Sequence, residues 1–214
     1  MIAMSSEQYG VFIVVTTLFM MAPGPSVMLA ISHGLKYGTR RSLMGVLGNV
    51  VASQSLIVLS SIGVGAVLMA SGELFRVVKI IGALYLLYLG VKLWFSSGGK
   101  AEVTAAVSLR EGSAIAIFQR GFLVTALNPK ALVYVSALLP QFIDATQSLM
   151  PQVVGLSLTY AGVQTMVFGG YALLASRARG WFSRPAKLLL FNRMAGITFI
   201  SFGVMLALSE NKSS

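Results

Sequence analysis

The sequence predicts an all-α membrane protein with six transmembrane helices, arranged as two inverted repeats of three helices. Apolar residues make up 56% of the 214 residues and charged residues only 10%, whereas a soluble domain has roughly 25% charged residues. The apolar residues gather in six runs, each long enough to cross a bilayer as a helix of ~20 residues. One run in each half of the chain is interrupted by a proline motif.

The six runs lie at residues 9–31, 43–70, 74–95, 114–139, 153–175 and 188–208. No basic residue precedes the first run, so we expect a retained helix rather than a signal peptide. The longest polar break, residues 96–113, is too short for a soluble domain. We therefore expect a single membrane domain over residues 1–214. Its first repeat covers about 1–97, a cytoplasmic loop 96–113, and the second repeat about 114–214.

Lysine and arginine are concentrated in the segments that follow the odd-numbered runs or flank those segments: Lys36, Arg40, Arg41, Lys92, Lys100, Arg110, Arg120, Arg177, Arg179, Arg184 and Lys187. Basic loops stay in the cytoplasm, so these segments are predicted to be cytoplasmic and both termini periplasmic. The same distribution accounts for the net charge of +10. Positive charge divided by side of the membrane argues against a nucleic-acid partner.

Each half contains an odd number of crossings, so the second half must cross the membrane in the opposite sense to the first. Pro23-Gly24-Pro25 interrupts the first run, and Asn128-Pro129-Lys130 interrupts the fourth. Proline removes one helical hydrogen bond and crowds the preceding turn, so both helices must break or kink. At ~1.5 Å per residue both breaks lie near the middle of the bilayer. Interrupted helices at corresponding places in two halves indicate a transport site.

Four motifs in this order resemble the lysine exporter (LysE) superfamily, in its RhtB branch of homoserine and threonine exporters. They are Pro23-Gly24-Pro25, Gly82-x-x-Tyr85-x-x-Tyr88-Leu89-Gly90, Asn128-Pro129-Lys130 and Leu138-Leu139-Pro140-Gln141-Phe142. The resemblance covers nearly the whole chain. It implies a bacterial inner-membrane exporter of amino acids or close derivatives, driven by proton antiport. Composition alone indicates only a small transporter or channel.

The resemblance makes Pro23, Gly24, Pro25, Asn128, Pro129 and Lys130 the motif residues, and we expect them to bind substrate. Gly24 leaves backbone groups open, and a helix that restarts beside it presents a positive dipole end to a carboxylate. Asn128 can both donate and accept hydrogen bonds. Carbonyl groups freed by Pro129 can accept from an ammonium group.

Lys130 gives the sharpest hypothesis, because an ammonium group in mid-membrane is expensive and no run holds an aspartate or glutamate beside it. We expect Lys130 to face a central cavity and to bind the substrate carboxylate or carry a proton. The alternative is that it snorkels to an interface or bonds backbone carbonyls as a structural contact.

The runs offer no acid to a cationic side chain, which favours a neutral zwitterionic substrate. Many members of the resembled superfamily have an aspartate in the fifth span, where this sequence has Gln164. Asn49, Tyr134 and Gln164 complete the predicted substrate-binding set. Hydrogen bonding between helices is the alternative role for each of them.

The chain has no cysteine and one histidine, and it contains no phosphate-binding glycine loop. We therefore expect no enzyme activity, no metal and no cofactor. A passive channel for small solutes and a non-transporting assembly subunit remain the alternatives to an exporter. Glycines recur every seven residues at Gly155, Gly162 and Gly169, and again at Gly196 and Gly203. We interpret them as helix-packing positions or as the seam of a homodimer.

Overall fold

The computed structural model describes residues 6–61, 72–95, 112–144, 146–182 and 185–208. The predicted cytoplasmic loop up to residue 111, the end of the second apolar run after Ser61 and both chain ends lie outside these residues. The regular structure of the described residues is helical, and no strand occurs among them.

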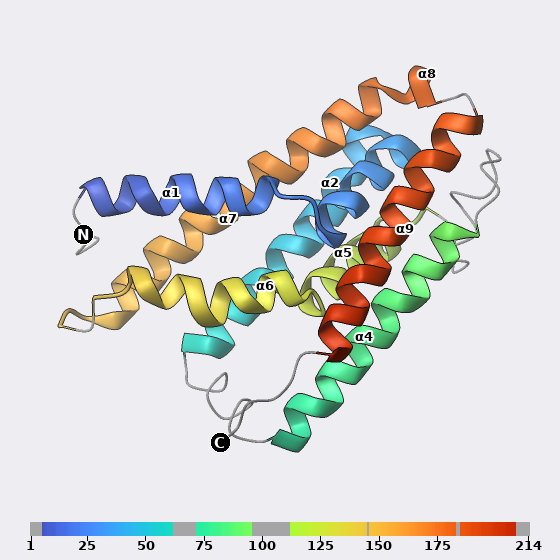
Figure 1. Ribbon diagram of the computed structural model, residues 1–214. Helices are drawn as coiled ribbons and strands as arrows, with labels where there is room; N and C mark the ends of the chain where they lie inside the picture. The colour runs from blue at the N-terminus through green and yellow to red at the C-terminus, as the bar shows by residue number, and fades with distance from the viewer. Residues whose placement is uncertain (1–5, 62–71, 96–111, 145, 183–184, 209–214) are drawn as a thin grey trace.

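The helices follow one another along the chain in Figure 1. They are α1 (Ser6–Met21), α2 (Pro25–Ser61), α4 (Gly72–Trp94), α5 (Ala114–Ala126), α6 (Pro129–Val133), a π-helical turn (Tyr134–Leu138), a 3-10 turn (Leu139–Phe142), α7 (Leu149–Arg177), α8 (Arg179–Phe182) and α9 (Pro185–Leu208).

Three of the described helices contain segments long and apolar enough to cross a membrane: Pro25–Ser61, Leu149–Arg177 and Ala186–Met205. A fourth is formed if α5 and the segment Pro129–Phe142, bent by 55°, are counted as one span. Many large apolar side chains are exposed, among them Met166 and Leu158, as expected for a surface that faces lipid.

Both predicted helix breaks are present. The first lies between the end of α1 at Met21 and the start of α2 at Pro25, and the carbonyl of Gly24 accepts the first helical bond, from the amide of Met28 at 3.0 Å. The second lies between α5 and α6. Here the side chain of Asn128 caps the new helix by accepting from the amide of Lys130 at 3.0 Å, with Pro129 in the first turn.

Helix α2 contains a further break, at Gly38, whose φ of 77° and ψ of 171° are readily adopted only by glycine. The part before Gly38 completes the first predicted run, and the part after it forms the second as far as Ser61. The two parts contact each other, since a Cβ on Gly45 would overlap with the ring of His33. Arg179 donates from Nε to the carbonyl of Leu35 at 2.6 Å, satisfying a carbonyl group that the helix end leaves free.

Small residues allow the close helix contacts of the fold. Helix α2 packs on α5 and α7, and α4 runs beside α9 (Figure 1). A Cβ on Gly48 would overlap with the carbonyl of Phe118 in α5, and Gly90 lies against Gly196. The packing role expected for Gly196 is therefore confirmed.

The packing role expected for Gly162 is wrong within a single chain. Gly162 is exposed and a Cβ there would meet nothing within 4 Å. A regular seven-residue spacing marks one face of a helix but does not indicate what that face contacts.

Candidate functional site

A small cavity of about 30 Å³ lies between the two helix breaks. Its lining comes from α1, α2, α5, α6, α7 and the breaks before α2 and α6: Phe19, Met20, Gly24, Ser26, Val27, Thr125, Asn128, Lys130, Ala131, Tyr160, Gln164 and Phe168. A buried water needs about 10–15 Å³ of such space, so the cavity has room for water but not for an amino acid. Residues from both halves of the chain therefore line one narrow space, whose surface is mainly apolar with a few polar groups.

Lys130 connects the two breaks. Its ammonium group donates to the main-chain carbonyl of Ala22 at 2.6 Å and lies 4.9 Å from the centre of the Phe19 ring. A Cβ on Gly24 would lie 3.5 Å from Cδ of Lys130 and 3.9 Å from its Nζ. Both partners of the ammonium group are uncharged. The structure thus places Lys130 in the cavity wall and also in the backbone contact named as its alternative role.

A chain of hydrogen-bonded side chains runs behind Lys130. The amide nitrogen of Asn128 donates to the hydroxyl of Ser26 at 3.1 Å, and the Ser26 hydroxyl lies 3.1 Å from that of Thr125. The side chain of Asn49 lies 3.1 Å from Thr125 and 2.7 Å from the carbonyl of Gly121, a contact that requires its nitrogen on that side. The chain fixes the backbone at both breaks.

Gln164 closes the cavity from α7. Its side chain is 2% exposed, and its nitrogen donates to the hydroxyl of Ser53 at 3.0 Å and to the carbonyl of Asn49 at 3.4 Å. Tyr160, one turn earlier on α7, also hydrogen-bonds to Ser53. The polar face of α7 is therefore held against the second part of α2.

The structure brings together four of the predicted site residues in the cavity wall: Gly24, Asn128, Lys130 and Gln164. Asn49 lies one hydrogen bond behind them. Tyr134 packs beside the wall, with its ring 5.1 Å from Phe19 and 4.9 Å from Tyr160 and its hydroxyl bonded to Thr16.

The three prolines do not line the cavity but shape the breaks. Pro25 and Pro129 are buried and begin helices, whereas Pro23 is exposed. Sequence reasoning missed Ser26, Thr125 and Phe19. Two positions in the sequence could have indicated the hydroxyl residues. Ser26 directly follows the first proline motif, and Thr125 lies three residues before Asn128.

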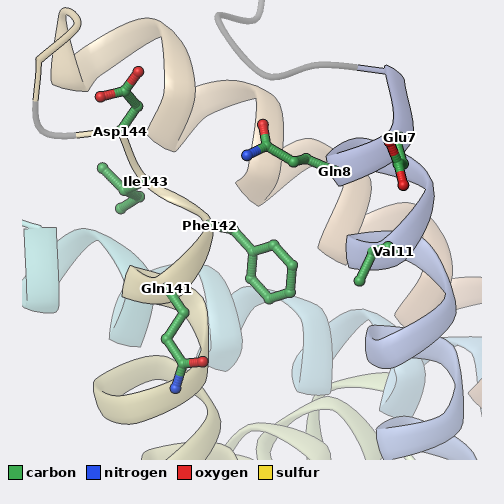
Figure 2. Close-up of a pocket in the computed structure, with 7 residues that line it drawn as sticks. All are labelled: Glu7, Gln8, Val11, Gln141, Phe142, Ile143 and Asp144. Atoms are coloured by element: carbon green, nitrogen blue, oxygen red, sulfur yellow. The ribbon is translucent and has the colours of Figure 1, made fainter.

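A second pocket, of about 440 Å³, opens between the start of α1 and the end of the 3-10 turn (Figure 2). In this view Phe142 points toward α1, and its ring packs edge-on against Phe12 at 5.1 Å. Asp144 at the rim accepts from the amide of Thr146 at 2.9 Å and from its hydroxyl at 2.6 Å. These bonds hold the pKa of the Asp144 carboxyl below its usual value.

Helix α1 lines both this pocket, termed the outer pocket, and the central cavity. Its side chains bond to the neighbouring helices through Tyr9 with Thr159 and through Thr16 with Tyr134. At its end, the carbonyl of Met21 accepts from the hydroxyl of Tyr171 at 3.0 Å.

The family described as LysE type translocator matches residues 17–210. An uncharacterized membrane protein of Vibrio cholerae is 34% identical over 93% of this chain and 96% of its own length. A homoserine/homoserine lactone efflux protein of Salmonella typhimurium is 30% identical over 95% of this chain and 98% of the relative. A leucine efflux protein of the same species is 24% identical over 93% and 94%. No solved structure matches the chain.

Proposed function

The chain belongs to the LysE type translocator family, and we propose that it exports a neutral amino acid or a close derivative across the bacterial inner membrane by proton antiport. Relatives named as efflux proteins for homoserine, homoserine lactone and leucine support this substrate class. The observation that carries the proposal is the cavity between the two helix breaks, with the Lys130 ammonium group in its wall.

Six crossings in two inverted repeats fit the contacts between helices. The crossings would be α1 with the first part of α2, the second part of α2, α4, α5 with the segment to Phe142, α7 and α9. A two-fold relation would exchange the first crossing with the fourth and the second with the fifth. Gly34 of the first crossing packs on Ala172 of the fifth, and Gly48 of the second packs on Phe118 of the fourth, as that exchange requires.

The contacts among basic segments fit cytoplasmic odd-numbered loops. Arg179 after α7 bonds the carbonyl of Leu35, and Arg120 donates to the hydroxyl of Tyr37 at 3.0 Å. A Cβ on Gly112, beside the start of α5, would lie 3.7 Å from Arg41. Three predicted loops therefore meet at one end of the molecule. Both termini would then be periplasmic, as would the outer pocket with Glu7 and Asp144.

The chemistry of the cavity favours a zwitterion. The carboxylate of the substrate would replace the Ala22 carbonyl as the partner of Lys130, next to the start of α2 at Pro25. Phe19, Met20, Val27 and Phe168 would contact an apolar or short side chain. None of the lining residues is acidic, which disfavours a cationic side chain.

Transport would proceed by alternating access. The three-residue break between Met21 and Pro25 lets α1 move relative to α2, opening the cavity to the outer pocket. Lys130 is the proton-coupling candidate, because loss of its proton would weaken its hold on the substrate carboxylate. The face of α7 around Gly162 remains available for a homodimer contact.

Purified protein in proteoliposomes tests the proposal. Labelled L-leucine or L-homoserine should show counterflow, and an imposed pH gradient should drive its accumulation. Flux without counterflow would favour a passive channel. Absence of any substrate-dependent flux would overturn the proposal in favour of an assembly subunit.

A further inference from the structure

Gln164 presents a buried hydrogen-bond acceptor without a partner. Among the described residues, none donates a hydrogen bond to its Oε1, although the side chain is only 2% exposed. Gln164 also lines the cavity between the helix breaks. Buried polar atoms are nearly always satisfied in folded proteins, so an exception in a cavity wall indicates a missing ligand or water.

The orientation of the Gln164 amide is fixed by its neighbours. The nitrogen faces the main-chain carbonyl of Asn49, which can only accept a hydrogen bond, and it also donates to Ser53. Exchanging the two ends of the amide would place two oxygens against each other. Oε1 is therefore the end left for a ligand, and only a donor can satisfy it.

The other polar side chains of the cavity wall are engaged. Asn128, Ser26 and Thr125 bond one another, and Tyr160 bonds Ser53. Lys130 supplies a positively charged donor in the same cavity. The wall therefore presents one cation and one unsatisfied acceptor, a pair that complements the carboxylate and the ammonium group of a zwitterion.

We infer that Oε1 of Gln164 accepts a hydrogen bond from the α-ammonium group of the substrate and makes that group a requirement for binding. This inference rests on the proposed function and assigns the specificity-determining atom of the same site. A ligand without a donor on its α-carbon would leave the acceptor buried and unsatisfied. Such ligands are expected to bind at least about tenfold more weakly.

Competition against labelled L-leucine counterflow in proteoliposomes tests the inference. The probes are unlabelled L-leucine and 4-methylpentanoate, which has the same carbon skeleton and carboxylate but no amine. The wild-type protein should discriminate between them by about tenfold or more. Gln164→Leu, which removes the acceptor, should reduce the ratio to about threefold or less.

Gln54→Leu is the matched control. Gln54 also connects α2 to α7, through Ser157, but it does not line the central cavity. This variant should keep the wild-type ratio. The stabilisation of purified protein by each probe in a thermal unfolding assay gives the same comparison without transport.

Equal inhibition by the two probes in the wild-type protein would overturn the inference even if no variant folds. If Gln164→Leu keeps the wild-type ratio between the two probes, the inference is also overturned. Gln164 would then have only a structural role, which affects the yield of folded protein but not the discrimination between the probes. L-homoserine and its amine-free analogue 4-hydroxybutanoate form a second pair of probes. If neither L-leucine nor L-homoserine gives flux or thermal stabilisation, the proposed function fails, and the inference fails with it. The first two outcomes leave the proposed function intact.

Discussion

The ammonium group of Lys130 donates a hydrogen bond to the main-chain carbonyl of Ala22, 108 positions earlier in the chain. Each residue lies at one of the two helix breaks, so a single side chain joins them beside the cavity. In the proposed mechanism a substrate carboxylate binds one of the other two donors of the ammonium group or replaces this carbonyl.

Lys130→Met is expected to reduce export by on the order of tenfold to a hundredfold, because a hydrogen bond to a charged group contributes about 1.5–3 kcal/mol. Methionine keeps much of the aliphatic stem, so the amount of folded protein should change little. The measurement is efflux of labelled L-leucine or L-homoserine from cells with matched protein levels. Lys187→Met, which removes an ammonium group stacked on Trp181, is the control and should export normally. Undiminished export by Lys130→Met would remove Lys130 from the mechanism.

Substitutions at Gly24 should show whether this position needs free volume beside Lys130 or the backbone freedom of glycine. A Cβ there would make ordinary contacts with Lys130 and, at 3.8 Å, with Phe202, so Gly24→Ala should fold and transport. Gly24→Leu would fill a cavity of only about 30 Å³ and push Lys130 aside. Its transport should fall by about tenfold or more, since overpacking of this kind costs about 1–3 kcal/mol. Gly10→Leu, where the glycine has no neighbour within 4 Å, is the control. Normal transport by Gly24→Leu would contradict the position assigned to the substrate.

Two glycines should respond differently to the same substitution. A Cβ on Gly121 would overlap with the carbonyl of Gly45, so Gly121→Leu should destabilise the contact of α5 with α2 by about 1–3 kcal/mol or more. Gly162→Leu should leave the stability of a single chain unchanged. The measurements are the thermal midpoint and yield in detergent, with the oligomeric state determined by light scattering. A lower dimer fraction in Gly162→Leu alone would place the dimer contact on that face, whereas equal destabilisation by both changes would contradict the packing described.

The proposed orientation can be tested with single cysteines, because the sequence contains none. Ala114→Cys lies at the start of α5 and Gln147→Cys in the segment before α7, and both positions are exposed. In intact cells opened only at the outer membrane, a membrane-impermeant maleimide should label Gln147→Cys and not Ala114→Cys. Both should react after lysis. The reverse pattern would invert the assigned topology, and labelling of both in intact cells would rule out a crossing between them.

The helix breaks could be predicted from sequence because their cause is covalent and local. Pro25 and Pro129 lack the amide hydrogen that a continuous helix needs, whatever surrounds them. The turn at Gly38 is also local, but the sequence indicated only a polar segment there. The positive φ of this one glycine instead lets the chain turn back between two helical segments.

The cavity could be predicted only in part. Gly24, Asn128 and Lys130 were found through motifs, whereas Ser26 and Thr125, 99 residues apart, meet only in the folded chain. Gly121 and Gly162 are the same residue type in apolar helices, and only the tertiary structure shows that one is enclosed and the other open. The effect of proline on a helix can be predicted from the sequence, but which residues become neighbours in the folded chain cannot.

Because the central cavity is narrow, the free-energy cost of admitting a substrate depends on the volume of its side chain. In the proposed transport cycle, a cavity with room only for water would have to widen for each substrate, and larger side chains would require a wider separation of α1 from the rest of the protein. Turnover should therefore slow with side-chain volume more steeply than affinity weakens. A preference for small substrates would then arise from the free energy needed to widen the cavity rather than from the shape of a preformed binding pocket.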